Sequence, residues 1–337
     1  MLRYQETLLL VKNLNCIFMV LLSQYSAQEY LLSLRTNRYE PLSQNTLFIE
    51  TLKSNFRTIK ITSVVSIKRN VIFEFNLGDT YYVLKHFFNK NELSKRSLLE
   101  EDNFEQTSFS HFNTEKGIFQ TQSTFIPTLH FCDNQSKMII MEKLFGYQEF
   151  YFLFNDVLSK DSLRKYYLQN LASLLLNFSK INTNSSLQYN SKNIITVGEL
   201  KNQDIVWEYY KKYSSAWNGD SIIHGDLFSR NILINKKTRD IKIIDWEMST
   251  IGDIYFDLSI VVSILCDCRL GTSFINVFYP IKDRAYDYAM LKKDINYFLD
   301  SYGTIDREKL KTFLIINTQH LSNNVVNLVN NINQIFS

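Results

Sequence analysis

Two aspartates and an asparagine in the second half of the chain have the types and spacing that phosphoryl transfer requires. Asp226 and Asn231 lie five positions apart in a loop that leads into an apolar strand, and Asp245 ends the strand after it. A carboxylate can orient an attacking hydroxyl group, while the side-chain oxygens of Asn and Asp suit the hard cation Mg²⁺. We therefore predict Asp226 as the catalytic base and Asn231 and Asp245 as the magnesium ligands.

Two short apolar strands must bring these three residues together. Residues 232–234 follow Asn231, residues 241–244 precede Asp245, and a polar turn joins the two runs. Because the strands of a hairpin are antiparallel, Asp245 should return to the side of Asn231. Singly, each of the three could be a turn residue, a cap or a solvated strand end; their spacing and strand context together favour a site.

Two residues near this loop are expected to support it and to take no part in the reaction. His224, at the start of the loop, should hold it through hydrogen bonds. Asp257 begins an apolar helix, where it should act as a cap and an anchor.

The rest of the chain predicts an α+β protein with a small antiparallel sheet followed by a larger helical part. Strands are expected at residues 58–62, 71–75, 81–87, 128–132 and 138–142, with a hairpin turn at 76–79. A helix carrying Glu115 should precede the fourth of them. Beyond Leu144 the pattern is mostly helical, as at 163–178 and 202–216.

The segments His224-Gly225-Asp226-x4-Asn231 and Ile244-Asp245-Trp246-Glu247 resemble the aminoglycoside phosphotransferase and choline kinase superfamily. Residues 249–259 resemble the Gly-Asp-Pro…Asp-Leu-Ala segment of that family, with Ile254 where Pro is common. The resemblance implies a protein-kinase-like two-lobed fold. It also implies ATP or GTP and Mg²⁺ as cofactors, and transfer of the γ-phosphate to a hydroxyl group of a small molecule. Candidate acceptors are an amino alcohol such as choline, a sugar or an aminoglycoside.

The same resemblance divides the chain into three parts. We predict an N-terminal helical extension at 1–55, a nucleotide-binding N-lobe at 56–142 and a catalytic and substrate-binding C-lobe at 143–337. In the N-lobe, Lys85 of the run Val-Leu-Lys should neutralise phosphate charge. Glu115 is the preferred acidic partner of Lys85, although an inserted helix at 91–101 must then be assumed, and three rivals stay open. These are Glu100, Glu101 and Glu105.

Further nucleotide contacts are expected at the connection between the lobes, where backbone groups of Met141 and Glu142 should recognise the base. Arg230 could reach the transferred phosphate or lie on the surface. Residues 63–70 should form the turn over the phosphates, yet this segment contains no glycine. A catalytically weak kinase-like binding or scaffold protein is therefore the alternative.

Substrate selection is open at the level of sequence. A cationic acceptor would need carboxylates or an aromatic cage, and residues of these types occur after the loop, although each aromatic could equally be a core residue. They are Trp217, Trp246, Glu247, Asp253 and Tyr255. A protein kinase is disfavoured because no Ala-Pro-Glu landmark follows the metal motif.

Composition excludes several other classes of protein. The 37 basic and 34 acidic residues are mixed along the chain and give a net charge of +3, so nucleic acid is not an expected partner. Four cysteines without paired spacing predict neither a disulfide framework nor a zinc site. The apolar segment 8–22 is interrupted and too short to span a bilayer, and it lacks a cleavage site. We therefore predict a cytoplasmic protein without a membrane span.

Overall fold

A computed structural model describes residues 59–66, 70–77, 80–87, 104–134, 138–181, 203–270, 288–319 and 325–337. The predicted extension at 1–55 and the inserted helix at 91–101 lie outside these residues. The chain divides into two compact units. Residues 1–123 with 127–144 form the N-terminal unit, and residues 124–126 with 145–337 form the C-terminal unit.

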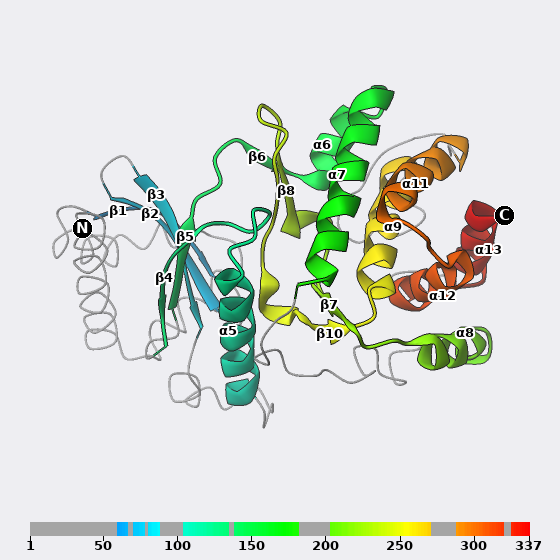
Figure 1. Ribbon diagram of the computed structural model, residues 1–337, viewed down its shortest axis with the longest axis horizontal. Helices are drawn as coiled ribbons and strands as arrows, with labels where there is room; N and C mark the ends of the chain where they lie inside the picture. The colour runs from blue at the N-terminus through cyan, green and yellow to red at the C-terminus, as the bar shows by residue number, and fades with distance from the viewer. Residues whose placement is uncertain are drawn as a thin grey trace. The chain divides into compact units, whose positions relative to one another are not determined.

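The N-terminal unit contains an antiparallel sheet with the strand order β1-β2-β3-β5-β4 (Figure 1). The pairing of Leu77 with Thr80 closes the β2–β3 hairpin at its predicted position. Ile139 and Ile140 in the middle of the sheet are fully buried. The elements of this unit are β1 (Ile59–Ser66), β2 (Asn70–Leu77), β3 (Thr80–Phe87), α5 (Phe104–Gln120), β4 (Leu129–Asp133) and β5 (Met138–Glu142).

Helix α5 packs on this sheet through one face. Phe112, Glu115 and Phe119 are three and four residues apart and therefore lie on the same side of the helix. The Phe112 ring meets the Phe87 ring of β3 edge to face, with the centroids 5.7 Å apart. The apolar neighbours on that face thus carry the Glu115 carboxylate to the buried side of α5.

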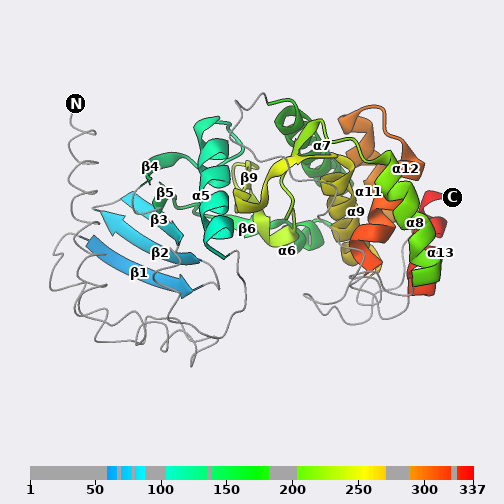
Figure 2. The same ribbon diagram turned by 90° about the horizontal axis from the view of Figure 1, so that it is seen from below.

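The C-terminal unit is mainly helical. Helices α7, α9 and α11 lie side by side, and α12 packs on α8 and α9 (Figures 1 and 2). Most of α9 is buried, in keeping with its largely apolar sequence. The helices are α6 (Phe150–Asp156), α7 (Asp161–Ser179), α8 (Gln203–Ala216), α9 (Tyr255–Leu270), α11 (Tyr288–Tyr302), α12 (Arg307–Thr318) and α13 (Val325–Phe336).

Two small antiparallel sheets complete this unit, and strands β7 and β8 flank the loop at residues 224–231. One has the order β6-β8-β9 and the other pairs β7 with β10. The sequence predicted β8 and β9, which a short polar turn joins, but not the other three strands, which are equally short or shorter and have partners far away in the sequence. Their bounds are β6 (Tyr147–Glu149), β7 (Ser221–Ile223), β8 (Ile232–Asn235), β9 (Ile241–Ile243) and β10 (Thr250–Gly252).

The predicted α+β class is confirmed, because the first unit contains an antiparallel sheet and helices dominate the second. One local prediction differs. Strand β1 continues to Ser66, four residues past its predicted end, because the β-branched pair Val64-Val65 extends the ladder with β2. Residues 63–66 of the predicted phosphate-covering turn at 63–70 therefore belong to β1, Asn70 begins β2, and residues 67–69 lie outside the described residues. Among the described residues, no helix is long and apolar enough to cross a membrane.

Candidate active site

The hairpin β8–β9 brings the three predicted residues together. Ile232 pairs with Ile243, and the next rung is the bond from the Ile244 amide to the carbonyl of Asn231, at 2.9 Å. Asp245 thus follows directly after the rung that Asn231 makes. On the other side, Asn231 Nδ2 donates to the carbonyl oxygen of Asp226 at 2.7 Å and to its Oδ2 at 3.2 Å.

The carboxylate of Asp226 lies in a partly buried position, with 23% of the side chain exposed. Burial raises the pKa of this carboxyl above its usual range, and the negative charge of Asp245 raises it further. Arg230 and the Asn231 amide act in the opposite direction, but burial outweighs them. A carboxylate with a raised pKa is a better proton acceptor than an aspartate in water.

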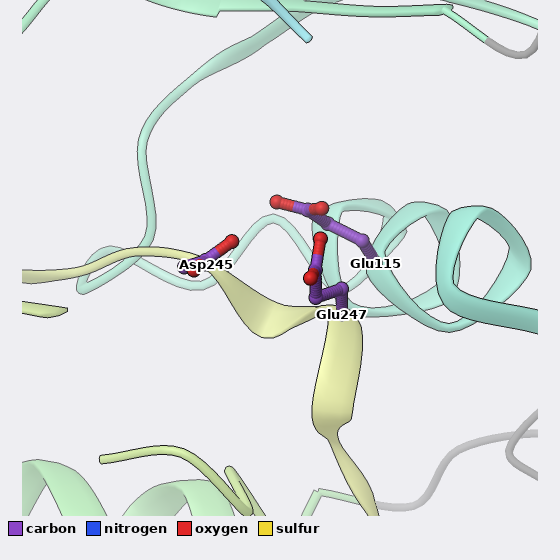
Figure 3. A group of neighbouring side chains, drawn as sticks. All are labelled: Glu115, Asp245 and Glu247. Carbon is purple, nitrogen blue, oxygen red and sulfur yellow. The ribbon is translucent and has the colours of Figure 1, made fainter. Parts of the chain in front are cut away.

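Asn231 and Asp245 offer oxygen donors that fit Mg²⁺. The Asn231 amide nitrogen is engaged by Asp226, which orients its Oδ1 as the atom for a cation, and the side chain is almost fully buried. Asp245 has a φ of 65°, a left-handed conformation that is uncommon for a non-glycine residue. The side chains of Asp245 and Glu247 are drawn in Figure 3, together with Glu115 of α5. Carboxylate and amide oxygens are the donors that this hard cation takes.

The strained backbone at Asp245 is held by the residue after it. Trp246 is fully buried, and its Nε1 donates to the carbonyl of Ile243 at 2.8 Å. Its ring packs against Phe178 with the centroids 4.4 Å apart. Trp246 is therefore a core residue, which leaves it no role in acceptor binding.

His224 bridges the loop and the hairpin, as its predicted supporting role requires. Its Nδ1 accepts from the backbone amide of Asp226 at 3.2 Å, so Nε2 carries the hydrogen and donates to the carbonyl of Ile244 at 2.9 Å. The ring is fully buried against Trp246. One neutral imidazole thereby links the residue preceding Asp245 to Asp226.

Asp257, at the start of α9, anchors the same loop. Its two oxygens accept from the backbone amides of His224 at 2.6 Å and Gly225 at 3.2 Å. The side chain is completely buried, and burial raises the pKa of its carboxyl to about 7, although both amides act to lower it. The predicted anchoring contact is thus present, and it fastens the loop to α9.

The raised pKa of Asp257 predicts a specific pH dependence of stability. Between about pH 4 and pH 7 the folded state holds a proton at this site that the unfolded chain has released, so rising pH lowers the contribution of Asp257 to stability. Asn at this position does not titrate. The difference in unfolding free energy between wild type and Asp257→Asn should therefore shrink from pH 4 to pH 7 in denaturant titrations. A difference that grows over this range would contradict the assignment.

Gly225 gives a second prediction, because the loop turns there in a conformation that other residues avoid. Its φ is +78°, and an added Cβ would lie 2.6 Å from the carbonyl oxygen of Met248. Gly225→Ala should cost about 1–2 kcal/mol in backbone strain alone and should displace the neighbouring Asp226. We expect a lower melting temperature and a larger loss of turnover than for Gly219→Ala, where the nearest atom would be the indole nitrogen of Trp217 at 3.5 Å, an ordinary contact distance. Equal turnover in the two variants would refute this.

In the N-terminal unit, Lys85 pairs with Glu115. The distance between Lys85 Nζ and Glu115 Oε2 is 2.8 Å, and the two side chains are 2% and 1% exposed. The Lys85 ammonium also lies 5.0 Å from the Phe87 ring centroid. The structure thus joins Lys85 to the acid that the sequence preferred, while the rivals Glu100 and Glu101 lie outside the described residues. A buried lysine held by one carboxylate is suited to meet phosphate oxygens.

The other predicted nucleotide contacts have different surroundings. Met141 is buried in β5. Glu142 joins β5 to the start of β4, because its Oε1 accepts from the Thr128 amide at 2.8 Å and its own amide donates to the Thr128 carbonyl. Arg230 is half exposed, with its guanidinium 3.5 Å from Asp226 Oδ2 and 5.5 Å from the Phe228 ring centroid. Arg230 is therefore a half-exposed cation next to Asp226.

Sequence reasoning missed Lys309, a residue that engages two of the candidate cation-binding residues. Its Nζ lies 2.7 Å from Asp253 Oδ2 and 4.6 Å from the Tyr255 ring centroid. Asp253 is buried and also accepts from the Asn218 amide. Because Lys309 is one of three basic residues on an ordinary helix, no motif marks it. Because Asp253 and Tyr255 already contact Lys309, they no longer support the binding of a cationic acceptor.

Comparison with known proteins places this geometry in a family. Residues 192–292, which include Asp226, Asn231 and Asp245, match the model of a phosphotransferase enzyme family. This segment is therefore similar to the sequences of that family. The predicted resemblance is thereby confirmed, as is the predicted class of enzyme, a small-molecule kinase. No curated protein matches the chain.

Solved structures of small-molecule kinases are similar to this chain over most of its length. Choline kinase LicA from Streptococcus pneumoniae is 11% identical, with 87% of this chain and 90% of that chain covered and a TM-score of 0.49. A spectinomycin phosphotransferase in complex with ADP and spectinomycin is 12% identical over 88% and 93%, with a TM-score of 0.47. Ethanolamine kinase from Plasmodium vivax is 13% identical over 85% and 83%, with a TM-score of 0.48.

Proposed function

We propose that this phosphotransferase moves the γ-phosphate of ATP or GTP to a hydroxyl group of a small molecule, with Asp226 as the base. The observation that carries the proposal is the contact of Asn231 Nδ2 with Asp226, next to the strand end that bears Asp245. The proposed base thus lies in the loop that leads into the β8–β9 hairpin, and the two proposed cation ligands lie at the ends of that hairpin. Phosphoryl transfer needs little more from a protein than such positioning and charge compensation.

Each side chain has a defined part in the proposed reaction. Asp226 accepts the proton of the acceptor hydroxyl as its oxygen bonds to the γ-phosphorus, and the bond from that phosphorus to the β–γ bridging oxygen breaks, releasing ADP or GDP. Asn231 Oδ1 and the Asp245 carboxylate would hold Mg²⁺, which neutralises phosphate charge when it is bound. Arg230 would contact the transferred phosphate. The half-exposed position of Arg230 near Asp226 supports that role.

In the N-terminal unit, Lys85 would bind the phosphates of the nucleotide while Glu115 fixes its ammonium group. The buried pair at 2.8 Å supports this assignment, because a desolvated lysine keeps its charge only beside a carboxylate. Backbone groups of Met141 and Glu142 would recognise the base. The acceptor would be an amino alcohol such as choline, a sugar or an aminoglycoside.

A nucleotide-consumption screen tests the proposal and names the acceptor. Purified protein is incubated with ATP or GTP and Mg²⁺, with amino alcohols, sugars and aminoglycosides as separate acceptor sets. We expect acceptor-dependent release of nucleoside diphosphate for one set and none without Mg²⁺. The rival reading, a catalytically weak binding or scaffold protein, predicts no turnover with any set. Absence of a Mg²⁺-dependent thermal shift at millimolar nucleotide would favour that rival.

A further inference from the structure

A short segment far away in the sequence covers the free side of β9. Because β9 is the last strand in the order β6-β8-β9, only one of its edges pairs with a strand of that sheet. Residues 124–126 lie along the other edge and belong to the same compact unit as β9. The Ile243 amide donates to the Phe125 carbonyl at 2.7 Å. We call residues 124–126 the strap.

Lys242 fastens the strap from the middle of β9. Its Nζ donates to the carbonyl of Thr124 at 2.7 Å and to that of Ile126 at 3.2 Å, and only 14% of the side chain is exposed. The Lys242 ammonium also lies 4.0 Å from the Asp240 carboxylate. A lysine ammonium can donate three hydrogen bonds, and two of these go to the strap. Lys242 therefore bridges the two ends of a three-residue segment.

The strap also packs against the residue next to the proposed metal ligand. Phe125 is 4% exposed, and its ring lies 6.1 Å from the Trp246 ring and 5.6 Å from the Phe178 ring, centroid to centroid. Trp246 directly follows Asp245, whose backbone is left-handed. A displaced strap would thus disturb Trp246 and, through it, the strained residue before it.

A three-residue strand has few bonds of its own to fix the side chain at its end. Strand β9 pairs with β8 through only three residue pairs, so the strap supplies the second support of this strand. Hydrogen bonds from a charged group are stronger than those between neutral groups. Losing the two bonds of Lys242 would loosen one side of β9, three residues before Asp245.

We propose that Lys242 is a positioning residue for Asp245: by holding the strap against β9, it fixes the carboxylate that binds magnesium. This inference rests on the proposed function, because it concerns the same ion. It predicts that removing the ammonium weakens Mg²⁺ binding while the acceptor is bound as before. Misplacement of a reacting group by about 1 Å can cost about 10²-fold in rate.

The test uses the full chain and the variants Lys242→Met, Lys242→Gln and Lys242→Arg. Mg²⁺ is titrated in the presence of ADP, and the rise in melting temperature is followed without turnover; kcat and the KM values for Mg²⁺ and acceptor are then measured. We expect Lys242→Met to need about tenfold more Mg²⁺ for half of the shift, with an unchanged KM for the acceptor. Arg, which can donate to both carbonyls, should restore most of the affinity, and Gln should restore part of it.

Two controls separate positioning from simple loss of stability. Lys236→Met removes an exposed pair with Asp156 at the turn of the same hairpin and should leave the Mg²⁺ titration unchanged. Asp161→Asn weakens the contact of Asp161 with the buried Arg164, as well as its contacts with Lys293 and Tyr297, and should lower the melting temperature without changing Mg²⁺ affinity. A Mg²⁺ requirement that rises in this variant as well would show that Lys242 acts only through stability and would overturn the inference.

The outcomes distinguish this inference from the proposed function. If wild type shows no Mg²⁺-dependent shift with ADP, the proposed function fails and the inference fails with it. If wild type shows the shift and Lys242→Met titrates identically, only the inference is overturned. Should Lys242→Met not fold, Lys242→Gln decides, because it keeps one donor for the strap; a wild-type Mg²⁺ titration in Lys242→Gln would then overturn the inference.

Discussion

Replacing Asp226 by Asn is expected to lower kcat by about 10²- to 10⁴-fold, the usual contribution of a positioned general base. The amide cannot take the proton of the acceptor hydroxyl. The Asn side chain has the same shape and keeps one oxygen that can accept from Asn231. In the wild type, Asn231 Nδ2 lies 3.2 Å from Asp226 Oδ2. Asp226→Ala should abolish transfer in the same way. Nucleotide binding with Mg²⁺ should stay nearly intact, because the proposed ligands Asn231 and Asp245 are both retained.

Single-turnover rates and the nucleotide-induced thermal shift, measured on the same preparation, separate these two effects. Asp245→Ala is the informative contrast, since loss of a metal ligand should reduce Mg²⁺-nucleotide binding as well as turnover. Asp220→Asn, at the far end of β7 from the loop, is the matched control. Its carboxylate accepts only from nearby exposed groups, so turnover should be unchanged. Wild-type turnover in Asp226→Asn on the true acceptor would refute the assigned mechanism.

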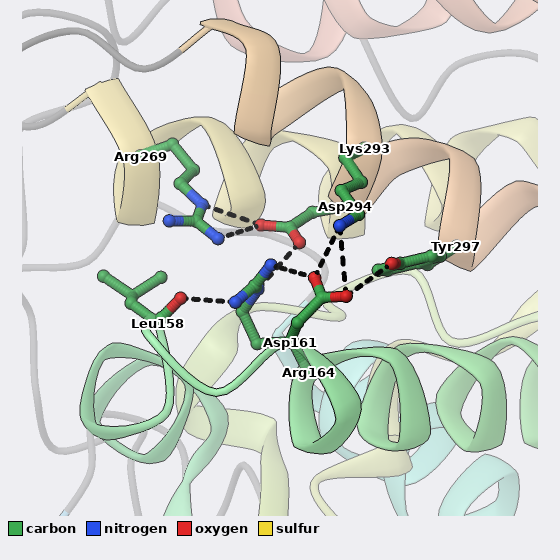
Figure 4. A network of polar contacts seen from close by, with 7 residues as sticks. All are labelled: Leu158, Asp161, Arg164, Arg269, Lys293, Asp294 and Tyr297. Carbon is green, nitrogen blue, oxygen red and sulfur yellow. Dashed lines mark hydrogen bonds and ion pairs between the residues drawn. The ribbon is translucent and has the colours of Figure 1, made fainter.

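Replacing Asp294 by Ala is expected to destabilise the C-terminal unit by about 3–5 kcal/mol, the typical cost of breaking a buried ion pair. The carboxylate of Asp294 is fully buried between two arginines (Figure 4). Its Oδ1 accepts from Arg164 Nε at 2.9 Å, and its Oδ2 accepts from Arg269 Nε at 2.7 Å. These residues belong to α7, α9 and α11, so a single carboxylate joins three helices. Without it, two buried guanidinium groups lose their shared counter-charge.

Denaturant unfolding followed by tryptophan fluorescence measures this loss. All three tryptophans lie in the C-terminal unit, so the signal reports on that unit. Lys293→Met is the control at the solvent-exposed rim of the same network. Lys293 pairs with Asp161 at 3.0 Å, but both side chains are almost half exposed, and such pairs contribute little. A destabilisation by Asp294→Ala no larger than that of Lys293→Met would show that the two arginines find other partners.

Local spacing predicted the centre of the candidate site. Asp226 and Asn231 are joined by one loop, and the β8–β9 hairpin returns Asp245 to Asn231 through a ladder whose register the short turn fixes. The strands of the first unit were predicted to within a few residues for the same reason, since alternation and turn residues act over short distances. The roles of these residues in the reaction remain predictions.

Distant pairings could only be decided by the folded chain. Lys85 and Glu115 are 30 residues apart, and the sequence offered several acids for the same lysine. The contact of Lys242 with Thr124 spans 118 residues, and Lys309 carries no motif that points to Asp253.

The sequence by itself predicted the class of chemistry, because the positions of the proposed base and of the two proposed oxygen ligands are set by the local geometry of one loop and one hairpin. The tertiary structure alone decided which charges neutralise one another and which aromatics are core, because packing of α9, α11 and α12 brings together residues whose separation along the chain carries no information about distance. Asp253 and Trp246 illustrate this, since both looked available for an acceptor and both are buried with partners inside the C-terminal unit.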